Sequence, residues 1–174
     1  MKIKILNTIT FIFFAFILFI FFLGLKNDQK YDTQNLVGNK LPDFNLEMLV
    51  GKGQIRSEDL KNNGYTLINF WSSWCGPCKL EHKYLISLKK NTNLKIVGIN
   101  FKDNKNNALE FLNNLGDPYH HLAKDINGKV SIKFGVYGIP ESILVDQNLK
   151  IKKKFVGPLN DNDYLEITKH IKKK

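Results

Sequence analysis

Cysteine is nearly absent from this chain, with two residues among 174, and histidine is scarce, with four. Two cysteines exclude a scaffold held together by several disulfides, and four histidines leave few ligands for a metal site. We find no internal repeat and no low-complexity block apart from the lysine-rich end, which excludes a repeat architecture. The length that remains after the amino terminus suffices for one compact domain with its own core.

Both cysteines lie in residues 74–78, which read Trp-Cys-Gly-Pro-Cys. The apolar run before them, 65–71, predicts a buried strand, and the apolar spacing after them predicts a helix. The pair therefore lies at a strand-to-helix junction, where positions i and i+3 share a face at a separation that a disulfide allows. The free N–H groups and the positive end of the helix start favour a thiolate at Cys75. This pattern predicts a reversible dithiol/disulfide site formed by Cys75 and Cys78.

Two other uses of the cysteine pair remain open from the residues alone. A structural disulfide would close a very small loop and would restrain the unfolded chain little. A tetrahedral zinc site would need two further ligands, for which His82 and either His120 or His121 are candidates. Haem attachment would require histidine directly after the second cysteine, where this chain has Lys79. We therefore expect redox chemistry of the thiols themselves, without a metal or another cofactor.

The amino terminus contains a long apolar run, which extends from Ile5 to Leu25 without a charged residue. About 20 such residues cross the hydrocarbon core of a bilayer as a helix. A cleaved signal peptide would have a shorter apolar region, typically about 7–15 residues, and a small-residue cleavage site that is missing here. We predict an uncleaved transmembrane anchor over residues 1–25, a polar tether over 26–37 and one domain over 38–174. Lysines flank the run on both sides, so the positive-inside rule does not choose an orientation.

The net charge of +10 raises the question of a nucleic-acid partner. The lysines are scattered, however, and neither a binding motif nor interleaved aromatic residues accompany them. Lys150, Lys152 and Lys154 alternate along a predicted late strand, where lysine commonly protects a sheet edge. We therefore expect no nucleic-acid partner and interpret these three lysines as edge protection.

Apolar periodicity and turn residues predict alternating strands and helices along the domain, followed by a hairpin and a last helix. Asn160 or Asp161 is the predicted cap of that helix. The predicted strands cover residues 43–46, 65–71, 94–100, 120–122, 142–145 and 151–156. The predicted helices cover residues 76–90, 104–115, 129–134 and a carboxyl-terminal segment that buries Tyr164, Ile167 and Ile171. This order predicts an α/β sandwich around a mixed sheet.

The cysteine motif, followed much later by Gly138-Ile139-Pro140 before a strand, resembles the thioredoxin fold. The resemblance implies that Pro140 is cis and faces the cysteine pair. The strand–helix segment between about 93 and 115 is similar to the insertion found in the membrane-tethered TlpA/ResA/CcmG branch of that superfamily.

Three further stretches narrow the resemblance to the CcmG/DsbE-type thiol:disulfide oxidoreductases of cytochrome c maturation. The resemblance covers about residues 38–160. Two positions depart from the family pattern, since Phe101 stands where Tyr is usual and Ser142 stands where Thr is usual. The three stretches are Asn100-Phe-Lys-Asp103, Gly116-Asp-Pro-Tyr119 and Gly135-Val-Tyr-Gly-Ile-Pro-Glu-Ser142.

The resemblance also implies roles for the residues around the thiols. Cys75, exposed at the helix start, would attack the substrate disulfide, and the more buried Cys78 would resolve the mixed disulfide. Thioredoxins carry a buried Asp where this chain has Asn69, and a neutral amide cannot accept a proton. Glu81 matches the functional glutamate of the ResA/CcmG branch, and Glu141 resembles the acidic residue beside the cysteines in that family.

Surface positions remain alternatives for both carboxylates, with Glu81 on a solvated helix face and Glu141 on a strand edge. If they serve the chemistry, we expect them to tune the thiols rather than to hold the fold. We expect Trp74 to be a partly exposed lid beside the thiol, and a packed aromatic residue is the alternative. An extended substrate would pair its backbone with Ile139, next to Pro140. His82 is interpreted as a helix-surface residue.

The implied function is that of a membrane-anchored reductase, single-pass in the bacterial inner membrane, with its domain facing the periplasm. Its acceptor would be apocytochrome c or the thiol-carrying partner of apocytochrome c, and its electrons would come from a membrane transporter of the DsbD/CcdA kind. The alternatives are a general thiol reductase of the TlpA/ResA type, an oxidant, or a module that binds a polypeptide without turnover. A peroxidase is suggested by Gly38-Asn-Lys-Leu-Pro-Asp-Phe44, but the complete cysteine pair argues against it.

Overall fold

The structure is a computed structural model, and it describes residues 2–25 and 36–172. The chain divides into two compact units, residues 1–32 and 33–174, which we describe separately. Most of the predicted tether, 26–37, lies outside the described residues, and so do the last two lysines.

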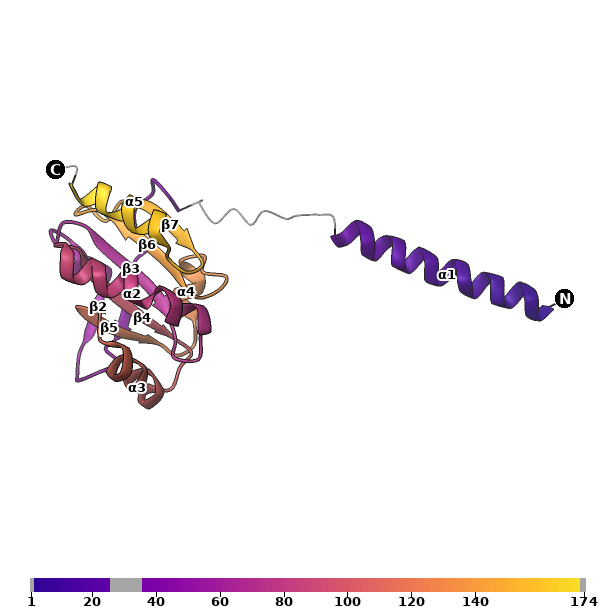
Figure 1. Cartoon of the computed structure of the whole chain (residues 1–174), viewed down its shortest axis with the longest axis horizontal. Coiled ribbons are helices and arrows are strands. Elements are labelled where there is room, and N and C mark those ends of the chain that lie inside the picture. Colours follow the sequence, from indigo (N-terminus) through magenta and orange to yellow (C-terminus); the bar gives the residue numbers. More distant parts are fainter. Residues whose placement is uncertain (1, 26–35, 173–174) are drawn as a thin grey trace. The chain divides into compact units, whose positions relative to one another are not determined.

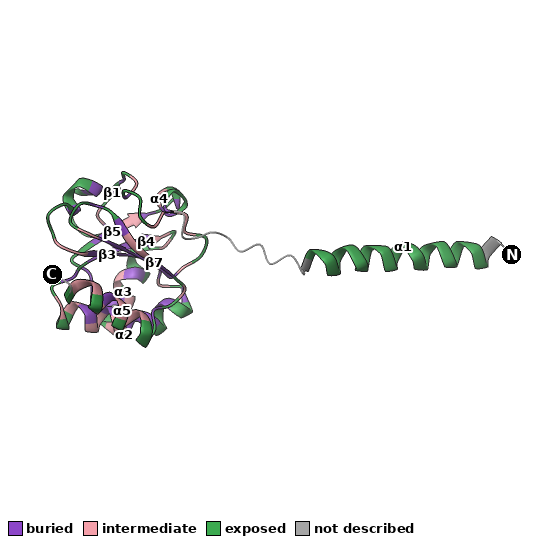
Figure 2. Ribbon diagram, turned by 90° about the horizontal axis from the view of Figure 1, so that it is seen from above, coloured by how far each residue is buried: buried purple, intermediate pink, exposed green. Residues whose placement is uncertain are grey.

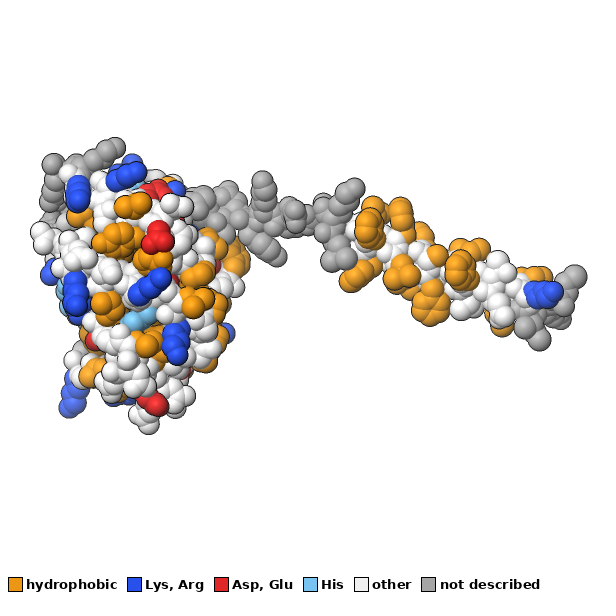
Figure 3. Space-filling model, viewed as in Figure 1, with side chains coloured by type: hydrophobic (Ala, Val, Ile, Leu, Met, Phe, Trp, Pro, Cys, Tyr) orange, Lys and Arg blue, Asp and Glu red, His pale blue; other side chains and the backbone are white. Residues whose placement is uncertain are grey.

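The first unit contains one helix, α1 (Lys2–Leu25). Residues Lys4–Gly24 are long and apolar enough to cross a membrane, with a mean hydropathy of 2.6. At about 1.5 Å per residue, such a helix matches a hydrocarbon core of about 30 Å. Thr8 and Thr10 donate their hydroxyls to the carbonyls of Lys4 and Leu6, so their polar groups are satisfied within the helix. Figure 3 shows apolar side chains along α1, and the side chains of residues 4–24 are exposed.

The second unit is built on a five-stranded sheet with the order β5-β4-β3-β6-β7 (Figure 1). β3, β4 and β5 are parallel, while β6 and β7 run antiparallel to their neighbours, which confirms the predicted mixed sheet. Its strands are β3 (Thr66–Trp71), β4 (Lys95–Phe101), β5 (His121–Asp125), β6 (Glu141–Val145) and β7 (Ile151–Val156). The other elements are β1 (Asn45–Glu47), β2 (Gln54–Arg56), the 3-10 helix η1 (Ser57–Leu60), α2 (Gly76–Asn91), α3 (Lys105–Leu115), α4 (Lys129–Lys133) and α5 (Asp161–Lys172).

The central strand β3 is buried along its whole length because both faces of the sheet are covered. Figure 2 shows α2, α3 and α5 on one face, and α4 with β1 on the other. Side chains alternate between the faces, so Leu67 and Trp71 pack in the core under α2, α3 and α5. Ile68 and Phe70 pack in the second core, beneath β1 and β2.

Local signals account for both ends of α3 and for the start of α5. Asn104 accepts backbone N–H groups from Asn106 and Asn107 and so caps α3, while Gly116 ends α3 with a φ of 90°. Asn160 accepts the N–H groups of Asn162 and Asp163 at the start of α5, so it is the cap among the two predicted candidates. Of the residues predicted to be buried by α5, Ile167 is fully buried, and Tyr164 and Ile171 are partly buried.

The interpretation of Lys154 as edge protection is wrong. β7 is an edge strand of the sheet, and residues 38–41 pair with its start through backbone hydrogen bonds to Leu149 and Ile151. Lys154 points into the protein and is buried. Burial of its ammonium group is tolerated because the carbonyl of Gly135 and the carboxylate of Glu141 bind it. Lys150 is exposed and Lys152 is half-buried.

Two segments differ from the predicted elements. β5 is a full strand of the main sheet, where the sequence indicated only a minor strand over 120–122. β2 and η1 were not predicted, because elements of three or four residues are too short to show a periodicity. β2 pairs only with β1, and together they close the second core.

Candidate redox site

The two cysteines lie at the end of β3, where the chain turns into α2. Cys75 is the cap residue of α2 and Cys78 lies in its first turn, with Pro77 between them. A disulfide joins the two cysteines, with their Cα atoms 5.3 Å apart. The N–H of Cys78 points at Cys75 Sγ from 3.2 Å. After reduction, this donor and the positive end of α2 stabilise a thiolate at Cys75.

The expectation that Cys75 is exposed is wrong for this disulfide form. Cys75 retains 5% of its surface and Cys78 retains 2%, so the order of exposure is as expected but both residues are buried. The cover comes from the loop before β6, because Cys75 Sγ lies 3.5 Å from the carbonyl oxygen of Ile139.

The loop over the cysteines contains the one cis peptide bond among the described residues, between Ile139 and Pro140. Pro140 is buried and Ile139 is half-buried. The carbonyl of Pro140 accepts a hydrogen bond from Gly157 N–H at 3.0 Å, which ties the loop to the end of β7. The structure therefore brings Cys75, Ile139 and Pro140 together.

Trp74 is 59% exposed beside the disulfide, and its indole Nε1 donates to the carbonyl of Lys102 at 3.2 Å. Lys102 lies in the loop that follows β4, and this loop also binds Ser73, the residue before Trp74. Asp103 accepts both the N–H and the hydroxyl of Ser73, at 2.6 and 2.8 Å. Sequence reasoning missed this anchor, although Asp103 belongs to one of the three stretches that carried the family resemblance.

Glu81 is fully buried, so its surface alternative is wrong. Its Oε1 accepts from Asn69 Nδ2 at 2.8 Å, and its Oε2 accepts from the N–H of Leu159 at 2.9 Å. Burial raises the pKa of Glu81 to about 7, while the two hydrogen bonds act in the opposite direction. Glu81 follows Cys78 by three residues on α2, hence on the same helix face. A carboxyl group that titrates near neutral pH therefore lies one turn from a cysteine.

Asn69 connects this carboxylate to two hydroxyl groups that sequence reasoning did not select. Its Nδ2 also donates to Ser142 Oγ at 3.0 Å, and its Oδ1 accepts from Tyr119 Oη–H at 2.9 Å. All of these side chains are buried. The amide that replaces the thioredoxin Asp thus uses both ends in one hydrogen-bond network with Glu81.

Glu141 is also buried, which rules out its surface alternative. Its Oε1 accepts the N–H groups of Tyr137 and Gly138, at 3.1 and 3.3 Å. Its Oε2 lies 2.9 Å from Lys154 Nζ, and Lys154 donates further to the carbonyl of Gly135 at 2.6 Å. This buried ion pair holds the loop that carries Ile139 and Pro140.

The two carboxylates lie on opposite faces of the sheet. Ser142 pairs with Asn69 across β3 and β6, and Glu141 pairs with Phe70. Since cross-strand partners share a face, Glu141 belongs to the core beneath β1 and β2, and the Asn69 network belongs to the face covered by α2. Glu81 and Glu141 therefore approach the cysteine region from different sides.

The interpretation of His82 as a helix-surface residue is wrong. Its Nε2 hydrogen-bonds the carbonyl of Gly116 at 2.8 Å, and its ring packs edge-on against Phe111. Burial lowers the pKa of His82, so the neutral ring donates this bond. His120 accepts the N–H of Ile96 through Nδ1. Within residues 2–25 and 36–172, no group of three or more His, Cys, Asp or Glu is arranged to hold a metal ion.

The sequence of this chain matches one family model and several known proteins. The family model described as Redoxin matches residues 36–169. The thiol:disulfide interchange protein DsbE of Vibrio cholerae is 39% identical over 131 residues, covering 75% of this chain and 71% of that protein. HelX of Rhodobacter capsulatus is 36% identical over 142 residues, covering 82% and 80%. DsbE of Escherichia coli K12 is 35% identical over 165 residues, covering 92% and 89%.

Solved structures with a similar fold include a crystal structure described as DsbE from Chlorobium tepidum. It is 27% identical with a TM-score of 0.67, and the match covers 78% of this chain and 94% of that chain. A solution structure described as a thioredoxin from Neisseria meningitidis is 28% identical with a TM-score of 0.65, covering 76% and 90%.

Proposed function

Because this chain belongs to the Redoxin family, in its DsbE group of thiol:disulfide interchange proteins, we propose that it is a membrane-anchored reductant in cytochrome c maturation. The chain is a thiol:disulfide oxidoreductase with a thioredoxin-like fold. The observation that carries the proposal is the Cys75–Cys78 pair at the start of α2, under the loop with the cis peptide bond. The acceptor we propose is a disulfide in apocytochrome c or in its thiol-carrying partner.

The geometry supports a two-step exchange. The thiolate of Cys75 attacks one sulfur of the substrate disulfide, which releases the other sulfur as a thiolate and forms a mixed disulfide. Cys78 then loses its proton and attacks Cys75 Sγ, which forms the Cys75–Cys78 bond and releases the second substrate thiolate. The two released thiolates then take up two protons, equal in number to those that Cys75 and Cys78 gave up, so the substrate gains two electrons and two protons and the enzyme loses them. A membrane thiol transporter of the DsbD/CcdA kind would return the electrons.

Substrate binding is assigned to the surface around the disulfide. Ile139 offers its backbone beside Pro140, where an extended segment can pair with it as an added strand. Trp74 offers an exposed aromatic face next to Cys75. Cys78→Ser, which cannot resolve the mixed disulfide, is the variant that identifies the acceptor.

Glu81 is the group we propose to take the proton from Cys78. It titrates near pH 7, it is buried, and it lies one helical turn from the thiol. Glu81→Gln should slow resolution of the mixed disulfide by about 100-fold, the low end of general-base effects. The rate should also lose its rise through pH 7. Single-turnover reduction of a peptide disulfide, followed between pH 5 and 9, measures both effects.

The pH dependence of the free energy of unfolding provides an independent check on the Glu81→Gln substitution. A folded pKa of about 7 lies above the ordinary value of 4.5, so the folded state holds this proton more tightly. The stabilisation is therefore present below about pH 4.5 and is lost as pH rises to about 7. Urea unfolding of Glu81→Gln should lack this slope. A variant with the rate profile of the unmodified chain would show that another group is the base.

The amino-terminal helix is the proposed anchor, with the domain on the periplasmic side of the inner membrane. The match to Escherichia coli DsbE leaves fewer residues outside than the 24 of α1, so the similarity reaches into this helix. After carbonate washing the full-length chain should stay in the membrane fraction, and protease added to spheroplasts should remove its domain. Release of a shortened soluble form would show instead that the segment is a cleaved signal.

A further inference from the structure

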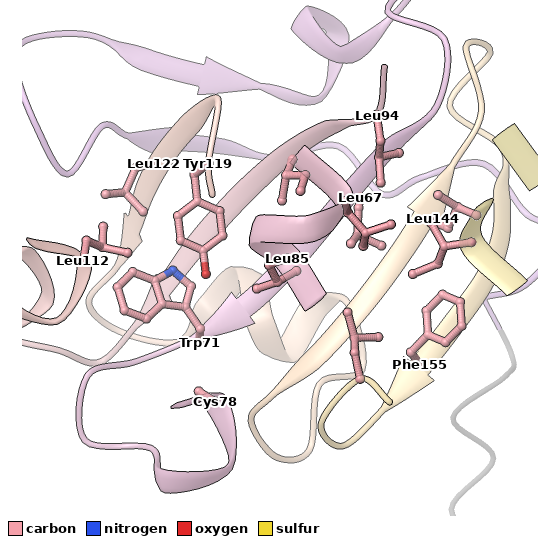
Figure 4. Packing of buried hydrophobic residues seen from close by; sticks show 14 of the residues in the cluster. Leu67, Trp71, Cys78, Leu85, Leu94, Leu112, Tyr119, Leu122, Leu144 and Phe155 are labelled. Atoms are coloured by element: carbon pink, nitrogen blue, oxygen red, sulfur yellow. The ribbon is translucent and has the colours of Figure 1, made fainter. Parts of the chain in front are cut away.

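Tyr119 ends the stretch Gly116–Tyr119, which carries family resemblance but has no part in the exchange steps above. Its side chain is buried, and its hydroxyl reaches Asn69 Oδ1 at 2.9 Å. Figure 4 shows its ring beside Trp71, and Cys78 belongs to the same buried cluster. The phenol therefore lies two hydrogen bonds from Glu81.

The position of the Tyr119 ring is set by its neighbours. Trp71 stacks on it, with the centroids 5.4 Å apart and the planes at 21°. Gly98 leaves the space that the ring needs, because a Cβ there would lie 2.7 Å from it. Asp117 accepts the N–H of Tyr119 at 2.8 Å, which fixes its backbone. The hydroxyl is thus held at one point next to Asn69.

The orientation of the Asn69 amide decides whether its N–H or its oxygen faces the carboxyl group of Glu81. As it stands, an N–H of Asn69 donates to Glu81 Oε1, which favours the ionised carboxylate. With the amide turned over, its oxygen would face Glu81, and only a protonated carboxyl group could make that bond. The two amide orientations therefore correspond to different proton affinities of Glu81.

We propose that Tyr119 is a positioning residue, which holds the Asn69 amide with its N–H toward Glu81 and so keeps that carboxyl group available as a base. Asn69 Oδ1 is the acceptor of the phenol hydrogen in the part of the chain that the structure describes. Turning the amide would leave that hydrogen without this partner. Burial raises the pKa of Tyr119 well above its ordinary value, so the phenol stays a donor at neutral pH.

Ser142 does not favour one orientation of the Asn69 amide over the other. Its hydroxyl accepts from Asn69 in the present orientation, at 3.0 Å, and it can donate to the amide oxygen in the other. Ser142→Ala is therefore a matched variant within the same network, while Tyr84→Phe removes a phenol from a half-buried tyrosine of α2 outside it.

The test is the carboxyl 13C titration of Glu81 by NMR in the full chain in detergent micelles, with the resonance assigned by Glu81→Gln. Tyr119→Phe should raise the midpoint by about one pH unit, a tenfold change in proton affinity. Ser142→Ala should move the midpoint less, and Tyr84→Phe should leave it in place. An unchanged or lower midpoint in folded Tyr119→Phe would overturn the inference.

A second measurement avoids any loss of folding in that variant. Replacing the six tyrosines by 3-fluorotyrosine makes the phenol a stronger donor without removing it, so the Glu81 midpoint should fall. No movement of the midpoint would contradict the positioning role.

This inference rests on the proposed role of Glu81 as the base. The experiments can nevertheless contradict the positioning role of Tyr119 and the base role of Glu81 independently of each other. If the Glu81 midpoint follows Tyr119 while Glu81→Gln exchanges at the normal rate, the positioning role stands and the base assignment falls.

Discussion

A Cys78→Ser variant should accumulate as a mixed disulfide between Cys75 and its natural acceptor. Attack on a disulfide requires a thiolate, and a serine hydroxyl at position 78 cannot release the substrate from Cys75. Multiple-turnover reductase activity should therefore fall to background. The trapped species should survive non-reducing electrophoresis and disappear on addition of dithiothreitol.

The matched control is Cys75→Ser, which should be equally inactive and should trap nothing. It keeps Cys78, but that thiol lies deeper and lacks the cap position of α2. Mixed disulfides that form through Cys78 in this variant would reverse the roles of the two cysteines.

Mass spectrometry of the trapped partner decides the proposed function. We expect apocytochrome c or a thiol-carrying maturation partner, bound through its own cysteine. Recovery of mainly unrelated secreted proteins would overturn the cytochrome assignment. So would a reduction potential near about −120 mV, the value of the strong oxidant DsbA, because a reductant of this compartment needs a much lower potential.

The second large effect concerns stability: Lys154→Met should destabilise the domain by about 3–5 kcal/mol. Lys154 and Glu141 form an ion pair at 2.9 Å, with both side chains almost completely buried. Removing one partner leaves the other charge buried without compensation, which is strongly destabilising. Since domains are stable by about 5–15 kcal/mol, much of the total would be lost. Equilibrium urea unfolding measures this directly.

A double-mutant cycle isolates the pair. Glu141→Gln alone should also destabilise, while the double variant Glu141→Gln/Lys154→Met should lose less than the sum of the two. Lys152→Met on the same strand is the control. Its ion pair with Asp146 is longer, at 3.9 Å, and more exposed, so it should cost less than about 1 kcal/mol. Additive losses at 141 and 154 would show that the pair is not coupled.

This result would revise the expectation that Glu141 does not hold the fold. Its carboxylate accepts two backbone N–H groups of the loop before Pro140, and Lys154 donates to a carbonyl of the same loop. The pair therefore supports the segment that lies on Cys75. We expect these variants to slow substrate reduction even in the fraction that stays folded.

The sequence by itself determined the order of the main elements and the place of the thiols. The apolar run 65–71 and the helical spacing after Cys78 put the cysteine motif between β3 and α2. Gly116 and the pair Asn160-Asp161 marked helix ends, and the charge-free run from Ile5 marked the candidate span. These signals are local, because periodicity, caps and span length depend on neighbours within a few turns.

Only the tertiary structure decided which polar side chains are buried. Four polar residues could be placed on the surface from the sequence, but all four are buried: Glu81, His82, Glu141 and Lys154. Periodicity along one element does not say which other element will cover it. The structure also supplied the partners of Asn69, which lie 12, 50 and 73 positions away at Glu81, Tyr119 and Ser142. Hydrogen bonds between such distant positions exist only after the sheet and α2 have packed, so no local pattern in the chain announces them.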